Sequence, residues 1–97
     1  MPSVVILRRA EVELMEACEW YEEQQLGLSL KFRTFINDRI NFIAQNPLLY
    51  PSRIRSEFRV VALKKYPFLI VYWHEQATDT VFITSIFHTK RDPQQLK

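Results

Sequence analysis

The chain has 97 residues, of which 47% are hydrophobic and 25% charged, and its formal net charge is +2. This length fits one small domain, residues 1–97, and the composition excludes a disordered chain. The longest apolar run, Phe68 to Trp73, is far shorter than the roughly 20 residues that cross a bilayer, so we expect no membrane span. The absence of a secretory signal and the single cysteine, Cys18, suit a cytoplasmic protein.

The charge is unevenly distributed along the chain. Residues 1–30 carry two cations and six glutamates, a net charge of −4, whereas residues 31–97 carry eleven cations and five acids, a net charge of +6. Such asymmetry is typical of a basic half that binds a polyanion or an acidic partner. Two solvated faces of opposite sign would give the same pattern, and the charge alone slightly favours that alternative.

The N-terminal part predicts a strand followed by a helix. Ser3–Leu7 is rich in β-branched residues and predicts the strand. Apolar residues then recur at steps of three and four, which predicts a helix with its glutamates on the opposite face. Gly27 is the only glycine and is the expected C-cap. The buried stripe of this helix is expected to consist of Ala10, Leu14, Ala17, Cys18 and Tyr21.

A second helix follows after a short connection. Ser29 is its expected N-cap, and Asn46-Pro47 ends it because a residue before proline is pushed out of the helical region. The short connection predicts an antiparallel helical hairpin. The stripe of the second helix is expected to consist of Leu28, Phe32, Phe35, Ile36, Ile40 and Ile43.

The C-terminal half predicts three strands after a loop at residues 48–57. The strands are expected at Phe58–Leu63, Phe68–Trp73 and Val81–Phe87, joined by turns at residues 64–67 and 74–79. Short turns favour an antiparallel meander. The predicted order is therefore β-α-α-β-β-β. We expect a two-layer α+β fold in which the helical hairpin packs on a mainly antiparallel four-stranded sheet.

The last two strands are apolar on both faces, yet a helical hairpin covers only one face of a sheet. Phe68, Ile70 and Tyr72 alternate with Leu69, Val71 and Trp73 along the third strand. A strand that is apolar on both sides is normally covered on both sides. We therefore expect a partner protein, or a second copy of the chain in a homodimer, to cover the other face.

A series of short residue patterns follows in a characteristic order over nearly the whole chain. The patterns are an Ala-x-x-x-Leu-x-x-Ala helix at residues 10–17, Trp20-Tyr21-Glu22, Gly27-Leu28, Phe32, Asn46-Pro47, Phe58-Arg59, Tyr66-Pro67-Phe68 with Ile70 and Tyr72, and His88 with Arg91-Asp92-Pro93. In this order and spacing the chain resembles the RelE/ParE superfamily of type II toxin–antitoxin toxins, most closely its ParE-like branch.

The resemblance implies a small toxin that is silenced by an antitoxin encoded beside it. ParE-type members poison DNA gyrase, and RelE-type relatives cleave mRNA in the ribosome. The antitoxin of this family wraps its toxin with a helix and a strand, which would cover the second sheet face. We assign antitoxin contact to Phe68, Ile70, Tyr72, Phe82 and Ile86.

The candidate chemistry lies at the ends of the predicted meander. A metal-free ribonuclease needs an acid or base and cations for the phosphate, and His88, Arg59 and Arg91 are the catalytic candidates. Glu57 is a candidate base. The opposing interpretation of His88 is a strand-end histidine bonded to the backbone, which the residues favour. Target or phosphate contact is assigned to Arg59, Lys64, Lys65, His88, Lys90 and Arg91.

The residues favour inhibition by binding over catalysis. RelE-type nucleases often place a tyrosine directly after the C-terminal histidine or near the terminus, whereas Thr89 follows His88 here. No metal-ligand spacing or phosphate-binding glycine loop occurs, so we expect no metal and no cofactor. The leading hypothesis is a ParE-like inhibitor of gyrase or a related target. The alternatives are a ribosome-dependent mRNA endoribonuclease and an inactive toxin-fold binding module.

Overall fold

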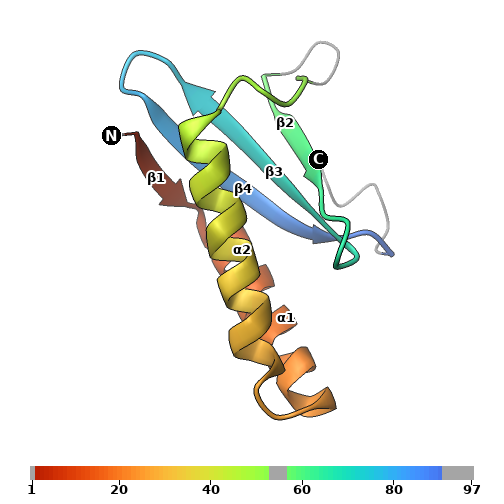
Figure 1. The fold of residues 1–97 in the computed structure, drawn as a ribbon. Helices are drawn as coiled ribbons and strands as arrows, with labels where there is room; N and C mark the ends of the chain where they lie inside the picture. Colours follow the sequence, from red (N-terminus) through yellow and green to blue (C-terminus); the bar gives the residue numbers. More distant parts are fainter. Residues whose placement is uncertain (1, 53–56, 91–97) are drawn as a thin grey trace.

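The structure is a computed structural model that describes residues 2–52 and 57–90 (Figure 1). The predicted order β-α-α-β-β-β is confirmed, and each predicted strand end lies within two residues of the observed one. None of the described helices is long and apolar enough to span a membrane. The elements are β1 (Ser3–Ile6), α1 (Arg8–Gln24), α2 (Leu28–Gln45), β2 (Arg59–Ala62), β3 (Phe68–Glu75) and β4 (Thr80–His88).

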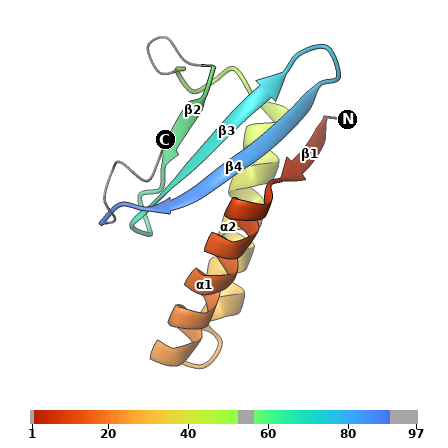
Figure 2. The ribbon, with the colours of Figure 1, turned by 180° about the vertical axis from the view of Figure 1, so that it is seen from behind.

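The four strands form one mixed sheet in the order β1-β4-β3-β2. β2, β3 and β4 form the predicted antiparallel meander. β1 lies beside β4 and runs parallel to it, from the Ser3–Thr80 pair to the Ile6–Ile83 pair. The two helices lie together on one face, as Figure 1 shows, and the sheet seen from behind in Figure 2 carries no helix. The predicted two-layer arrangement is therefore confirmed.

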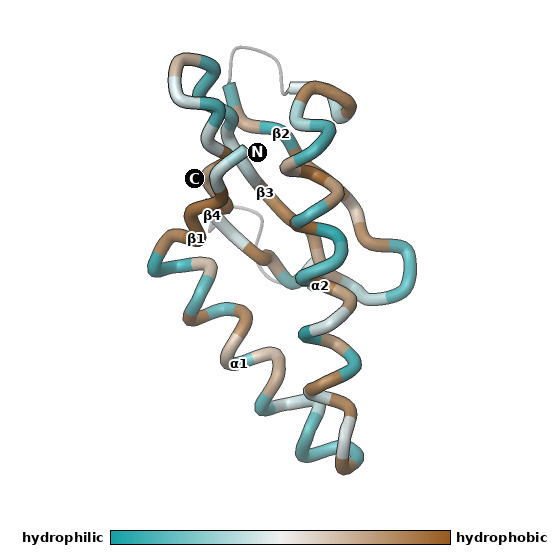
Figure 3. The backbone as a smooth tube through the Cα atoms, turned by 60° about the vertical axis from the view of Figure 1, so that its left-hand side comes forward, coloured by the Kyte–Doolittle hydropathy of each residue, from teal (hydrophilic) through white to brown (hydrophobic). Residues whose placement is uncertain are grey.

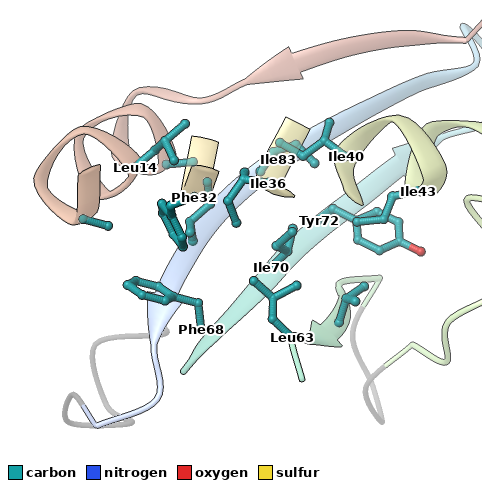
Figure 4. Close-up of a cluster of buried hydrophobic side chains, with 14 of the residues drawn as sticks. Leu14, Phe32, Ile36, Ile40, Ile43, Leu63, Phe68, Ile70, Tyr72 and Ile83 are labelled. Atoms are coloured by element: carbon teal, nitrogen blue, oxygen red, sulfur yellow. The ribbon is translucent and has the colours of Figure 1, made fainter. Parts of the chain in front are cut away.

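The core lies between the helical hairpin and the inner face of the sheet. Both helices alternate hydrophobic and hydrophilic residues (Figure 3), and their hydrophobic stripes meet the strands in the cluster of Figure 4. Burial of each large aliphatic or aromatic side chain in this core contributes about 1.5–3 kcal/mol. The helices supply Ala10, Leu14, Ala17, Cys18, Phe32, Ile36, Ile40, Ile43 and Ala44, and the sheet side supplies Val61, Leu63, Phe68, Ile70, Tyr72, Val81, Ile83 and Ile86.

Four of the five residues that were assigned to antitoxin contact lie on the inner face of the sheet and not on its open face. Phe68, Ile70, Tyr72 and Ile86 are at most 6% exposed because they point at the helices. Alternation along a strand separates its two faces but does not say which face the helices cover. Only Phe82 of the assigned residues lies on the other face.

The face without helices, here called the outer sheet face, is nonetheless apolar. Val5, Phe82 and Trp73 are neighbours across β1, β4 and β3 in the sheet register, and Leu69 lies on the same side of β3. The rings of Trp73 and Phe82 stack with their centres 5.0 Å apart. Val5 is 40% exposed. The prediction of a second apolar face is therefore confirmed, with different residues on it.

The connection between the helices is held by Glu22. Its carboxylate accepts hydrogen bonds from the backbone N–H groups of Gly27 and Ser29, at 3.0–3.1 Å and 3.0 Å. Gly27 has a φ of 91°, the left-handed conformation that glycine adopts at low cost, but it is the N-cap of α2. The predictions of Gly27 as the C-cap of the first helix and of Ser29 as the N-cap of the second are therefore wrong; Gln25 ends α1.

Candidate functional site: a groove between α1 and the ends of β3 and β4

A groove of about 640 Å³ lies between α1 and the adjoining ends of β3 and β4. α1 contributes Glu13, Glu16 and Trp20, and the sheet contributes Phe68 and His88. Lys90, just past β4, lies at the same groove. Trp20 is 56% exposed although it is a large aromatic side chain. The groove thus combines an exposed ring with acidic and basic groups.

His88 is bonded to the backbone at the end of β4. Its Nδ1 accepts a hydrogen bond from the Lys90 backbone N–H at 3.1 Å. The ring also meets Phe68 edge to face, with centres 4.9 Å apart. A ring nitrogen that accepts a hydrogen bond carries no proton, so this contact fits the neutral tautomer protonated on Nε2. The geometry is that of the backbone-bonded histidine which the sequence favoured.

Glu13 is the group that the sequence analysis missed. It is buried, 6% exposed, and its Oε1 accepts hydrogen bonds from the Ser85 hydroxyl at 2.8 Å and the Ile86 N–H at 3.0 Å. Arg9 Nε lies 3.6 Å from its Oε2. Its carboxylate therefore ties α1 to β4. The spacing contained the signal, because Glu13 lies three residues after Ala10 and so falls within the apolar stripe.

A bulge in β4 precedes the backbone N–H group that Glu13 accepts from. The register changes from the Tyr72–Ile83 pair to the Val71–Ser85 pair, so Thr84 has no counterpart on β3. An extra residue disrupts the ladder and redirects the following backbone groups. A buried N–H without an acceptor would destabilise the fold, and Glu13 supplies the acceptor to Ile86.

Only some of the cationic residues that were assigned to target contact lie near one another in the structure. Lys64 and Lys65 are exposed in the turn between β2 and β3. The Thr89 N–H donates to the Pro67 carbonyl at 2.9 Å, which joins this turn to the end of β4. Lys90 follows there and is also exposed. These three lysines therefore share one end of the sheet, whereas Arg91 lies outside the described residues.

Arg59 has a different place and a structural contact. It lies at the start of β2, opposite Tyr72, and its guanidinium donates to the Tyr50 carbonyl. The Tyr72 hydroxyl donates to the Pro47 carbonyl at 2.6 Å, and burial raises the pKa of Tyr72. Both contacts hold the segment after α2 against the sheet. Arg59 therefore does not lie with the three lysines at the other site but contacts the segment that follows α2.

A second hollow, of about 450 Å³, lies beside Arg59. Glu57 and His74 contribute to its lining, and His74 Nε2 lies 2.9 Å from a carboxylate oxygen of Asp79. Glu57, the candidate base, is therefore in a different hollow from His88. Among residues 2–52 and 57–90, no cluster of three or more histidine, cysteine or acidic side chains is arranged to hold a metal.

The comparison with family models identifies the chain. The model described as the ParE toxin of type II toxin–antitoxin system, parDE, matches residues 4–93. The chain belongs to the ParE toxin family. The match extends from β1 beyond the end of β4, so the groove and the outer sheet face both lie within the part that is typical of ParE toxins. A search of curated proteins finds no match.

Solved structures share the fold of this ParE-family chain at low sequence identity. A chain of the chromosomal ParDE toxin–antitoxin system from P. aeruginosa matches with a TM-score of 0.77 and 17% identity, covering 93% of this chain and 98% of that one. A chain of the intact E. coli RelBE toxin–antitoxin complex gives 0.68 and 16%, covering 94% and 100%. The isolated E. coli RelE toxin gives 0.68 and 15%, covering 99% and 93%.

Proposed function

We propose that this protein is a ParE-like toxin that inhibits DNA gyrase, or a related target, by binding to it, and that a cognate antitoxin keeps it inactive. The observation that carries the proposal is the family match over residues 4–93. The contacts in the groove support a binding role. His88 is engaged with the Lys90 backbone and Glu13 with β4, so both acid–base groups have structural partners.

The target contact is assigned to the basic end of the sheet. Lys64, Lys65 and Lys90 are exposed there, and hydrogen bonds between Thr89 and Pro67 keep the two segments adjacent. A cluster of like charges guides an acidic partner or polyanion to one surface. Arg59 is left out of this surface because its guanidinium bonds to the Tyr50 carbonyl.

A supercoiling assay with purified gyrase tests the target. The wild-type chain should inhibit supercoiling, and Lys64→Glu/Lys65→Glu should require about tenfold more protein for the same inhibition, since reversed charges oppose docking. Arg8→Glu/Arg33→Glu, at exposed positions of α1 and α2, is the charge-matched control and should inhibit as the wild type does. Absence of inhibition at concentrations that arrest growth would overturn the gyrase proposal.

The groove and the outer sheet face are the proposed antitoxin contacts. The groove presents Trp20, and the outer sheet face presents the stacked pair Trp73 and Phe82 beside Val5. Exposed apolar surfaces of this kind are covered in a complex. Structural neighbours come from toxin–antitoxin systems, which supports a protein cover. In the absence of antitoxin, a homodimer through the outer sheet face is the alternative.

Titration calorimetry with the product of the adjacent gene tests the antitoxin contacts. Trp20→Ala and Trp73→Ala should each weaken binding by about thirtyfold or more, because buried aromatic anchors are worth about 2 kcal/mol or more. Leu26→Ala is the control, since Leu26 is 88% exposed between the two helices and lies on neither surface. Unchanged affinity in both tryptophan variants would exclude these surfaces.

The second candidate function is ribosome-dependent mRNA cleavage. It is favoured by one observation, that His88, Glu13 and Lys90 line a single groove. Primer extension on cellular mRNA after induction would reveal new ends if the chain cleaves RNA. Loss of both those ends and the growth arrest in His88→Ala would support catalysis. Growth arrest without new ends supports the binding proposal, and growth without any arrest supports an inactive toxin-fold module.

A further inference from the structure

A row of alternating cationic and aromatic side chains runs along one side of α2. Lys31, Phe35, Arg39 and Phe42 follow one another at steps of four, four and three residues, which places them on one face of the helix. The Arg39 guanidinium carbon lies 5.9 Å from the centre of the Phe35 ring and 5.6 Å from that of Phe42. These four residues and Lys65 are called the basic–aromatic ridge.

Lys65 joins the ridge from the turn between β2 and β3, which lies on the β2 side of α2 (Figure 1). Its Nζ is 5.8 Å from the ring centres of both Phe35 and Tyr66. Tyr66 packs edge-on against Phe35, with ring centres 5.1 Å apart, so the turn is anchored to the helix. Cations from two separate elements therefore flank the same ring, where cation–π attraction limits their movement.

The ridge is exposed and carries an excess of positive charge. Lys31 and Lys65 are exposed, and Phe42 is 41% exposed although it is a large apolar side chain. Asp38 is the single acid of α2, whereas α1 carries six glutamates. The formal net charge is therefore −4 on α1 and +2 on α2, so the charge asymmetry along the sequence includes a difference between the two helices. A surface of this charge attracts anionic partners.

We propose that the basic–aromatic ridge docks an acidic amphipathic segment of a partner protein, with its carboxylates on the three cations and its apolar side chains on Phe42. Arginine and aromatic residues are enriched in protein interfaces. A nucleic acid fits less well, because bases stack on open ring faces and both Arg39 and Lys65 lie against the Phe35 ring. The ridge is separate from the groove and the outer sheet face, but it shares Lys65 with the basic end of the sheet that is assigned to gyrase. Lys31 and Arg39 belong to the ridge alone, so substitutions at these two positions test this proposal independently of the gyrase proposal.

Fluorescence anisotropy with a synthetic probe tests the ridge. The probe is a fluorescein-labelled helical peptide of about 18 residues, or five turns, with glutamate and leucine alternating along one face to match the ridge. It is titrated with the purified full chain. Two control peptides have lysine in place of glutamate, or the same composition with glutamate and leucine on opposite faces. The matched peptide should bind most tightly, and added salt should weaken its binding.

Two double variants with the same change in net charge decide whether the ridge itself is responsible. Lys31→Glu/Arg39→Glu should weaken binding about tenfold or more, and Arg8→Glu/Arg33→Glu, exposed but off the ridge, should stay within about twofold of wild type. Circular dichroism verifies folding. If the ridge variant does not fold, Lys31→Gln and Lys65→Gln replace it, and they should weaken binding in the same direction.

Three results would overturn the proposal. Equal weakening by the two double variants would show that only net charge matters. Equal binding of the lysine peptide, or of the peptide with rearranged faces, would show that the ridge does not select acidic amphipathic segments. Tighter binding of a single-stranded oligonucleotide of the same charge, lost in the ridge variant, would assign the surface to nucleic acid instead.

Discussion

Replacing Glu13 by alanine is the sharpest test of how α1 is held on the sheet. The side chain is 6% exposed, and one carboxylate oxygen receives both the Ser85 hydroxyl and the Ile86 N–H. Both donors follow the bulge in β4, and both point to the Glu13 carboxylate on α1. Alanine removes the acceptor from both groups at once, without changing a strand residue.

The expected loss follows from the two hydrogen bonds. A buried donor left without its acceptor costs about 1–3 kcal/mol. The Ser85 hydroxyl can rotate, whereas the Ile86 N–H cannot, so we expect the free energy of unfolding to fall by about 2–4 kcal/mol in total. The Arg9 contact, at 3.6 Å with Arg9 40% exposed, adds less than about 0.5 kcal/mol. Glu13→Gln keeps an acceptor oxygen and should cost about 1 kcal/mol.

Urea unfolding followed by far-ultraviolet circular dichroism measures these losses. Glu19→Ala, at an exposed position of the same helix, is the control and should change stability by less than about 0.5 kcal/mol. A double-mutant cycle with Ser85→Ala should give a coupling of about 1 kcal/mol. Equal stability of Glu13→Ala and Glu19→Ala would exclude a stabilising role for the two hydrogen bonds, and so would an equal loss in Glu13→Gln and Glu13→Ala.

Three further predictions concern the connections between elements. The backbone N–H groups of Gly27 and Ser29 hold the pKa of Glu22 below its ordinary value of 4.5, so its contribution is present above that pKa and is lost as the pH falls. Glu22→Gln should therefore lower the midpoint of thermal unfolding near pH 7, and its difference from the wild type should shrink as the pH falls below 4.5; a difference independent of pH would contradict this. Gly27→Ala should lower the free energy of unfolding in urea by about 1 kcal/mol, because a side chain is strained at a φ of 91°. The added methyl group meets no atom within 4 Å, so backbone strain is the only expected cost, and an unchanged stability would contradict it. Tyr72→Phe should cost about 1 kcal/mol in the same assay by removing the hydrogen bond to the Pro47 carbonyl, and an unchanged stability would contradict that contribution.

The elements were predictable because each carries a local signal. The residues of α2 that recur at helical spacing, such as Phe32, Ile36, Ile40 and Ile43, are the ones that the structure buries. Asn46 is the C-cap, as the following proline predicts. Periodicity and proline geometry depend on a few neighbouring residues, so these signals can be recognised in the sequence without knowledge of the tertiary contacts.

The errors all involve contacts that cross a connection between elements, over five residues for Glu22 and more than 70 for Glu13. Gly27 begins α2 rather than ending α1 because the carboxylate of Glu22 reaches over the connection. Arg59 bonds to the Tyr50 carbonyl, which its sequence neighbours do not suggest. Glu13 resembles the other glutamates of α1 in type but meets β4, more than 70 residues later in the chain. Local patterns contain no information about such partners.

The sequence by itself determined the order of elements, the hairpin, the meander and the presence of a second apolar sheet face, since these depend on periodicity and on turn length. The tertiary structure alone decided that β1 lies beside β4 and that Phe68, Ile70 and Tyr72 face the helices. It also decided where the groove lies. The physical reason is that alternation along a strand defines two faces without distinguishing them, and only the packing of the helices breaks that equivalence.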